Sequence, residues 1–288
     1  EQNYPLRVLV CEGCWLAQTE DFARPGEIFE ADYAYFSGYS STWVEHCKNY
    51  AKYMIERFSL GPTSSVIEVG SNDGTLLRFF SDASMRCTGI EPTLGTAEAA
   101  RALGLAVVTE FLTYDLAVLL RTRGLRADLL VANNVLAHVP DINDFVSACS
   151  MLLSEGGVAT SEFPHLQELL AGSEFDTIYH EHYSYLSLVS VESVFSQAGL
   201  MVFDVEQLST HGGSLRVYAQ RSNSGIHEAL PSVAAVRCLE SDAGLATPHA
   251  YSRLQVEADR IRDELLPTTP VPGSAVPRHL GEPTGSDP

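Results

Sequence analysis

The sequence predicts an α/β protein whose centre is a doubly wound, Rossmann-like sheet of five parallel strands, completed by a C-terminal antiparallel hairpin. Apolar runs typical of buried strands alternate with helix-like segments from residue 66 to residue 163. Strict alternation of this kind requires βαβ crossovers, and therefore parallel strands. Two further strand-like segments, 201–209 and 214–222, are joined only by THGG. So short a link connects antiparallel neighbours.

The elements follow one another in a regular order. Residues 4–18 predict a short β unit with a CxxC turn, and Ser41 or Thr42 is expected to cap a helix that runs to Phe58. The five parallel strands are predicted at 66–71, 85–92, 106–110, 127–136 and 157–163. Helices are predicted at 74–82, 95–103, 113–123, 190–199 and 248–266. A further helix is predicted to begin at Asp141 and to be stopped by the Gly156-Gly157 pair.

Composition restricts the class of function. The 288 residues are 45% hydrophobic and 19% charged, which is enough apolar material for a substantial core. The net charge of −19 repels a phosphate backbone, so nucleic acid is not expected as a partner. No apolar run is long enough to span a membrane, and the first residues do not have the pattern of a signal peptide. Scattered cysteines indicate a reduced, cytoplasmic protein.

Changes in pattern divide the chain into four parts. Residues 1–40 contain the CxxC pair, Cys11 and Cys14, and read as a partial N-terminal module. Residues 41–225 form the α/β domain, and residues 226–266 a helical linker. Residues 267–288 are rich in Pro, Gly, Ser and Thr, and are expected to be disordered. Because the chain starts on a strand-like run, we expect it to be cut at its N-terminus.

A glycine turn between the first parallel strand and its helix predicts a cofactor site. Such a turn lets a ligand approach the backbone at the carboxyl edge of the sheet. Glu91 lies 21 positions after Gly70, the separation expected for a carboxylate that binds a ribose diol. A purely structural turn is the alternative. The residues of the turn are Glu68, Gly70, Asn72, Asp73 and Gly74.

The charge of this turn distinguishes between cofactors. Glu68 and Asp73 suit the ammonium and sulfonium groups of S-adenosylmethionine and oppose a dinucleotide pyrophosphate. Asn72 stands where methyltransferases commonly have a middle glycine, and Asn tolerates the left-handed backbone such a turn needs. Five parallel strands closed by a hairpin also follow the sheet plan of class I methyltransferases, whereas a nicotinamide-binding domain keeps six parallel strands.

Two polar segments predict the rest of the site. Asn133, Asn134 and His138 follow the fourth strand, where methyltransferases close over the methyl donor; a turn cap or a surface histidine is the structural alternative. The run YHEHYSYL places Tyr179, His180, Glu181, His182, Tyr183 and Tyr185 within seven positions. If this run is extended, His180 and His182 share a face and could bind a metal. Alternatively one histidine is a base that its neighbours orient, which we favour, or the groups only satisfy a buried loop.

The motifs EVGSNDGTLL, GIEPT, NNVLAHVPD, YHEHYSYLS and HGGSLRVY together resemble the sugar 3-C-methyltransferases of antibiotic biosynthesis, which act on nucleotide-linked 4-keto-deoxysugars. The likeness covers most of residues 1–222. It implies an S-adenosylmethionine-dependent enzyme with an N-terminal zinc module and a C-terminal Rossmann-like domain. Carried onto this chain, the resemblance makes His182 the base, with Tyr179 and Glu181 beside it. It places Asn134, His138 and Tyr33 in the sugar pocket.

The resemblance also implies a reaction. The 4-keto group of a nucleotide-linked (dTDP) sugar acidifies the hydrogen on carbon 3; a base removes it, and the enolate carbon attacks the sulfonium methyl. Two features depart from the family. Only Cys11 and Cys14 of four zinc cysteines are present, so we do not expect this chain to hold zinc tightly. A proline-rich tail stands where the C-terminal domain should begin. An O- or N-methyltransferase and a non-catalytic cofactor-binding relic remain as alternatives.

Overall fold

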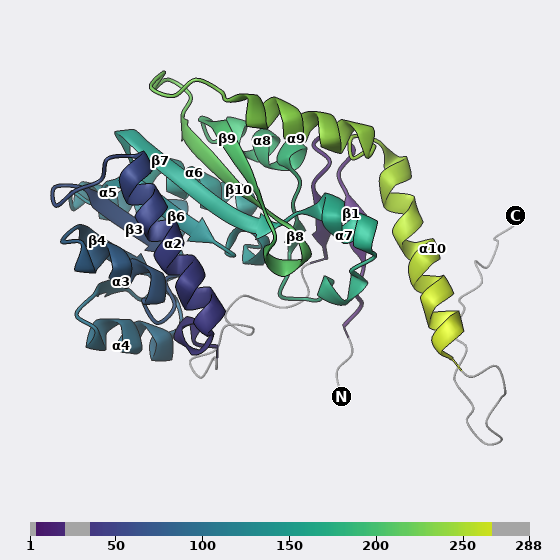
Figure 1. Cartoon of the computed structure of the whole chain (residues 1–288), viewed down its shortest axis with the longest axis horizontal. Coiled ribbons are helices and arrows are strands. Elements are labelled where there is room, and N and C mark those ends of the chain that lie inside the picture. The colour runs from purple at the N-terminus through teal and green to yellow at the C-terminus, as the bar shows by residue number, and fades with distance from the viewer. Residues whose placement is uncertain (1–3, 21–34, 267–288) are drawn as a thin grey trace, which may run out of the picture.

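The computed structural model describes residues 4–20 and 35–266 (Figure 1). Tyr33 and the tail 267–288, for which the sequence analysis made predictions, lie outside the described residues.

A mixed seven-stranded sheet forms the centre of the molecule, in the order β5-β4-β3-β6-β7-β10-β9. The first five of these strands are parallel, and β10 is antiparallel to both β7 and β9. The predicted α/β class I methyltransferase fold, with its closing hairpin, is confirmed. The strands are β3 (Ser65–Val69), β4 (Arg86–Ile90), β5 (Ala106–Val108), β6 (Ala127–Asn133), β7 (Leu153–Pro164), β9 (Leu200–Leu208) and β10 (Ser214–Arg221).

Helices cover both faces of the sheet because successive strand residues point to opposite sides. Val66 of β3 packs with the helices of one face, and the next residue, Ile67, packs with those of the other. The first face carries α2 (Ser41–Arg57), α3 (Thr75–Asp82) and α4 (Leu94–Ala102). The second carries α5 (Tyr114–Thr122), α6 (Ile142–Leu152), α8 (Leu188–Gln197) and α9 (Pro231–Asp242).

The N-terminal hairpin is joined to a distant part of the chain. The strands β1 (Val8–Val10) and β2 (Ala17–Thr19) form a small sheet with β8 (Ser184–Tyr185). Under it lie α7 (Leu166–Gly172) and the first turns of α10 (Pro248–Leu265), whose Tyr251 hydroxyl donates to the Trp15 carbonyl at 3.2 Å. The rest of α10 extends away from the sheet (Figure 1). The YHEHYSYL run is therefore attached on one side to the CxxC hairpin.

Three features of the prediction were wrong or missing. The cap of α2 is Ser40, whose side chain accepts from Trp43 N, not Ser41 or Thr42. The Gly156-Gly157 pair does not stop α6, which ends at Leu152; it lies inside β7, where the register against β6 shifts. A Cβ on Gly157 would come within 2.4 Å of the Ala127 carbonyl, so this close approach requires glycine. Helix α9 was not predicted.

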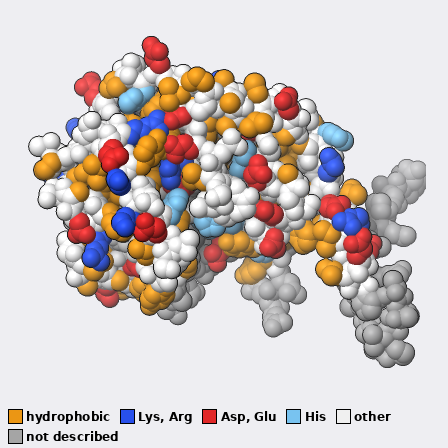
Figure 2. Space-filling view, in the orientation of Figure 1, with side chains coloured by type: hydrophobic (Ala, Val, Ile, Leu, Met, Phe, Trp, Pro, Cys, Tyr) orange, Lys and Arg blue, Asp and Glu red, His pale blue; other side chains and the backbone are white. Residues whose placement is uncertain are grey.

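Charge is dispersed over one face of the molecule. On the face shown in Figure 2, Lys and Arg side chains lie among Asp and Glu side chains, so the acidic excess does not gather there in one patch. Within residues 4–20 and 35–266, every helix is too short or too polar to cross a bilayer.

Candidate functional site

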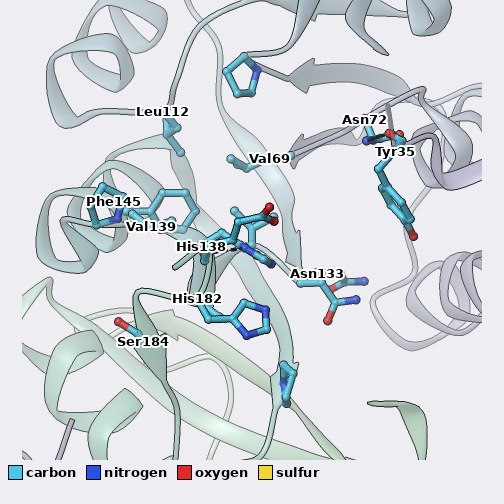
Figure 3. A pocket seen from close by; sticks show the side chains of 18 of the residues that line it. Tyr35, Val69, Asn72, Leu112, Asn133, His138, Val139, Phe145, His182 and Ser184 are labelled. Carbon is cyan, nitrogen blue, oxygen red and sulfur yellow. Dashed lines mark hydrogen bonds between the residues drawn. The ribbon is translucent and has the colours of Figure 1, made fainter. Parts of the chain in front are cut away.

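A cavity of about 870 Å³ opens at the carboxyl ends of β3, β4, β6 and β7 and brings together most of the predicted residues. Asp73 and Gly74 do not line it, and Tyr33 is outside the described residues. His138 and His182 lie side by side in Figure 3, while Asn72 and Tyr35 lie together on another wall. The predicted residues that line the cavity are Glu68, Gly70, Asn72, Glu91, Asn133, Asn134, His138, Tyr179, Glu181 and His182.

The glycine turn has the predicted backbone. Gly70, Asn72 and Gly74 have φ of +64°, +49° and +79°, so Asn72 does adopt the left-handed conformation. A Cβ on Gly70 would lie 2.6 Å from Cγ2 of Val135, and one on Gly74 would lie 2.4 Å from Cδ1 of Leu105. Any side chain at either position would clash, so the turn leaves bare backbone at the cavity wall.

The Glu91 carboxylate is held in place by hydrogen bonds within the protein. It is 5% exposed, and its Oε2 accepts from the backbone N of Asn72 at 2.8 Å. Its Oε1 accepts from the backbone N of Thr93 at 2.9 Å and from the Thr93 hydroxyl. A carboxylate offers about four lone-pair sites, so both sites of Oε1 are occupied and one site remains on Oε2. The carboxylate is thus rigid and can still accept a hydrogen bond from the cavity through Oε2.

Several buried polar atoms on the cavity wall have no hydrogen-bond partner among the described residues. They are Oε2 of Glu68, Oγ of Ser71, and both amide atoms of Asn133. Burial raises the pKa of the Glu68 carboxyl well above its usual value, and the nearby Glu91 and Asp73 raise it further. Unpartnered buried groups are costly. A ligand with a positive charge, hydrogen-bond donors and at least one acceptor for the Asn133 amide N–H would satisfy them.

His182 is oriented by its neighbours, as a base must be. Its Nδ1 lies 2.9 Å from the carbonyl oxygen of Thr177, which can only accept, so Nδ1 carries the proton. The lone pair of the neutral ring is then on Nε2, which lies 3.0 Å from the Tyr179 hydroxyl. Burial lowers the pKa of His182, and His211 lowers it further. The ring is therefore neutral at pH 7, with its acceptor nitrogen Nε2 against the Tyr179 hydroxyl, another residue of the cavity wall.

The backbone around His182 differs from the extended segment considered in the sequence analysis. Residues 179–182 form a tight turn, closed by the His182 N–H donating to the Tyr179 carbonyl at 3.0 Å. The turn brings Tyr179 against His182, their ring centroids 4.2 Å apart. His180 instead points away, with Nε2 3.0 Å from the Pro5 carbonyl, and does not line the cavity. The two histidines are thus held by different partners, which disfavours their binding one metal.

His138 lies against His182 but has a different hydrogen-bond partner and a lowered pKa of its own. The ring centroids are 4.7 Å apart, and Nδ1 of His138 is 3.0 Å from the Glu181 carbonyl oxygen. Burial, and next His182, lower the pKa of His138 to about 4. A ring that stays neutral this far below pH 7 adds no positive charge beside His182. His138 belongs to the 3-10 turn Leu136–His138, which follows β6 after Asn134.

Sequence reasoning missed a further histidine of the cavity, His165. It follows directly after β7 and is 2% exposed, and its Nε2 is 2.8 Å from Oε1 of Glu240 in α9. Glu240 also accepts from the backbone N–H groups of Leu188 and Val189 at the start of α8. The rule that ligands bind beyond the carboxyl ends of strands could have identified His165. Other missed residues of the wall are Trp43 and His211.

The CxxC pair lies outside this cavity. Cys11 is exposed and Cys14 partly buried, and both are free thiols. Within the part of the chain that the structure describes, no group of three or more His, Cys, Asp or Glu side chains could hold a metal ion. Weak zinc binding by Cys11 and Cys14 stays a prediction.

Comparison with known proteins relates most of the chain to methyltransferases. Residues 43–205 match a family described as a methyltransferase domain, and residues 209–269 match one described as a C-methyltransferase C-terminal domain. The chain is 33% identical over 265 residues to the C-methyltransferase NovU of Streptomyces niveus, an alignment that covers 92% of this chain and 63% of NovU. It thus spans less than two thirds of that relative's length.

Solved structures share the fold at low identity. The magnesium protoporphyrin IX methyltransferase of Synechocystis PCC 6803, solved with bound SAH, is 16% identical. It superposes with a TM-score of 0.50 over 62% of this chain and 83% of its own. A protein of Pyrococcus horikoshii OT3 is 11% identical, with a TM-score of 0.51 over 65% of this chain and 94% of its own.

Proposed function

This chain belongs to the methyltransferase-domain family, and we propose that it carries out S-adenosylmethionine-dependent methylation at carbon 3 of a nucleotide-linked 4-keto-deoxysugar. The C-terminal match to a C-methyltransferase domain and the likeness to NovU support carbon as the acceptor. The observation that carries the chemistry is His182, a residue of the cavity wall whose Nδ1–H is bonded to the Thr177 carbonyl, so that its lone pair is on Nε2, against the Tyr179 hydroxyl.

The cofactor half of the cavity fits S-adenosylmethionine. Glu91 would accept from a ribose hydroxyl at the free site of its Oε2. The unpartnered Oε2 of Glu68 and amide of Asn133 would accept from and donate to the methionine part. The bare backbone at Gly70 lets the ligand approach closely. When bound, the cofactor supplies an electrophilic methyl group on a sulfonium. A positive ligand also stabilises the charged form of Glu68, which burial alone disfavours.

The substrate half performs the proton transfer. Nε2 of His182 takes the proton from carbon 3, and the electron pair of that C–H bond moves into the enolate of the 4-keto group. The proton on Nδ1 stays bonded to the Thr177 carbonyl, which holds the resulting imidazolium in position. The Tyr179 hydroxyl contacts Nε2 and must move away from it when the substrate binds. Carbon 3 of the enolate would then bond to the methyl group while the bond between that methyl and sulfur breaks; its electron pair would stay on sulfur, and S-adenosylhomocysteine would leave.

Solvent exchange tests this proposal directly. In D₂O, with S-adenosylhomocysteine present, the protein should catalyse exchange of the carbon 3 hydrogen of a dTDP-linked 4-keto-6-deoxysugar, followed by NMR. Exchange without methyl transfer isolates the base. An O- or N-methyltransferase, or a domain that only binds cofactor, would leave the carbon 3 hydrogen at its uncatalysed rate, and that result would reject the proposal.

Glu91→Ala should weaken S-adenosylhomocysteine binding by roughly 2 to 3 kcal/mol, because it removes a charge-assisted hydrogen bond to the ribose. Isothermal calorimetry measures the loss. Glu98→Ala on the exposed side of α4 is the matched control and should leave affinity unchanged. Because Glu91 also bonds Asn72 and Thr93, Glu91→Gln should lose less. Equal affinities for the wild type and Glu91→Ala would remove Glu91 from the site.

A further inference from the structure

Asn72 makes more hydrogen bonds than its left-handed backbone conformation in the turn requires. Its Oδ1 accepts from the backbone N of Ser37 at 2.9 Å and of Asp73 at 2.9 Å. Its Nδ2 donates to the Tyr35 carbonyl at 3.0 Å. Its own N–H bonds Glu91. Glycine would adopt φ of +49° at least as easily. The backbone conformation therefore does not account for an asparagine at this position. Its side-chain hydrogen bonds do, and most of them are to another segment of the chain.

That segment is residues 35–39, called the strap below, which includes the 3-10 turn Ser37–Tyr39. Tyr35 and Ser37 line the cavity on the same wall as the glycine turn. The Gly38 N–H donates to Oδ2 of Asp73 at 2.9 Å. A Cβ on Gly38 would lie 3.0 Å from that oxygen and 3.1 Å from Oγ1 of Thr75. The strap therefore lies directly on the turn, as Tyr35 beside Asn72 shows in Figure 3.

We propose that Asn72 is a positioning residue that fastens the strap over the cofactor half of the cavity and thereby slows the release of a bound nucleoside. The proposal rests on the proposed function only for the identity of that ligand. One residue joins three parts: its backbone bonds Glu91, its side chain bonds the strap, and its conformation forms the turn. A ligand held by Glu91 and covered by the strap can leave only after the bonds of Asn72 to Ser37 and Tyr35 open.

The test uses Asn72→Gly, which keeps the turn and removes only the side-chain bonds. Stopped-flow mixing with S-adenosylhomocysteine, followed by the fluorescence of the cavity residue Trp43, should show dissociation about tenfold faster, the equivalent of about 1.4 kcal/mol. The association rate should change less than about threefold, as is usual for variants of one site. Ser84→Gly is the control, since Ser84 is also a non-glycine with positive φ, 67°, but lies outside the cavity. It should leave both rates unchanged.

A double-mutant cycle and hydrogen exchange complete the test. Gly38→Ala should also speed dissociation, and combining it with Asn72→Gly should add little, because both loosen the same strap. Without any ligand, Asn72→Gly should raise amide exchange at Ser37 and Gly38 about tenfold, and Ser84→Gly should not. Unchanged exchange at these amides, or fully additive dissociation rates, overturns the proposal. Failure of the wild type to bind S-adenosylhomocysteine would instead reject the proposed function, and the exchange result would still decide the role of Asn72.

Discussion

Replacing His182 by asparagine is expected to slow exchange at carbon 3 by roughly two to four orders of magnitude, the usual share of a positioned general base. Asparagine can still donate to the Thr177 carbonyl, but it has no basic nitrogen to replace Nε2. Affinity for S-adenosylhomocysteine should stay within about twofold of the wild type, because the residue acts on the sugar. NMR in D₂O measures the exchange, and calorimetry measures the affinity.

His180→Asn is the matched control for this experiment. His180 is two positions away, is bonded to the Pro5 carbonyl and does not line the cavity. We expect its replacement to lower the exchange rate less than about threefold. Equal losses in the two variants would contradict the assignment and indicate a metal pair or a structural role. Because the chain covers 63% of NovU, NovU itself should be measured alongside.

The rate of exchange should also depend on pH in a way set by burial. Burial lowers the pKa of His182 below its usual value, so its ring remains neutral to lower pH than a free histidine does. The exchange rate at low substrate concentration should therefore be level near pH 7. It should fall about tenfold per pH unit only below the lowered pKa. An acid limb at or above the ordinary histidine pKa would contradict a buried His182 as the base.

Glu240→Ala should destabilise the folded protein by roughly 3 to 5 kcal/mol, the scale for breaking a buried ionic network by removing one partner. Glu240 is 2% exposed and bonds Nε2 of His165 and two backbone N–H groups at the start of α8. Alanine would leave all three donors buried without an acceptor. Urea unfolding, followed by far-UV circular dichroism, measures the free energy difference.

Another carboxylate between the same two helices provides the control. Glu192 of α8 pairs with Arg237 of α9, but the Arg237 side chain is 55% exposed. Glu192→Ala should therefore cost no more than about 1 kcal/mol, as exposed ion pairs do. Similar losses for Glu192→Ala and Glu240→Ala would show that Glu240 contributes no more than a surface pair. Destabilisation by Glu240→Ala would also show that Glu240 holds α9 to the methyltransferase domain.

Parts of the site could be predicted from the sequence because they depend on residues that are close together in the chain. The left-handed backbone at Asn72 and the N-cap at Asp141 depend on neighbouring residues, and both predictions are confirmed. The spacing of Gly70 and Glu91 spans one strand–helix–strand unit, which brings consecutive carboxyl ends to the same edge of the sheet. By contrast, the role of the Asn72 side chain depends on Ser37 and Tyr35, which lie 35 and 37 positions earlier in the chain.

Hydrophobic periodicity, helix caps and link lengths act over a few residues. The sequence alone was therefore enough to predict the alternation of strands and helices, the antiparallel hairpin and the polar edge of the sheet on which the cavity lies. Which side chains of that edge enter the cavity depends on contacts between distant segments. Strand β8 is two residues long, too short to show a period, and it exists because it pairs with β2, more than 160 positions away. That pairing and the turn at 179–182 direct His182 into the cavity and His180 out of it. Likewise His165 acquires its partner from α9, because hydrogen bonds between distant segments form only when the core brings those segments together.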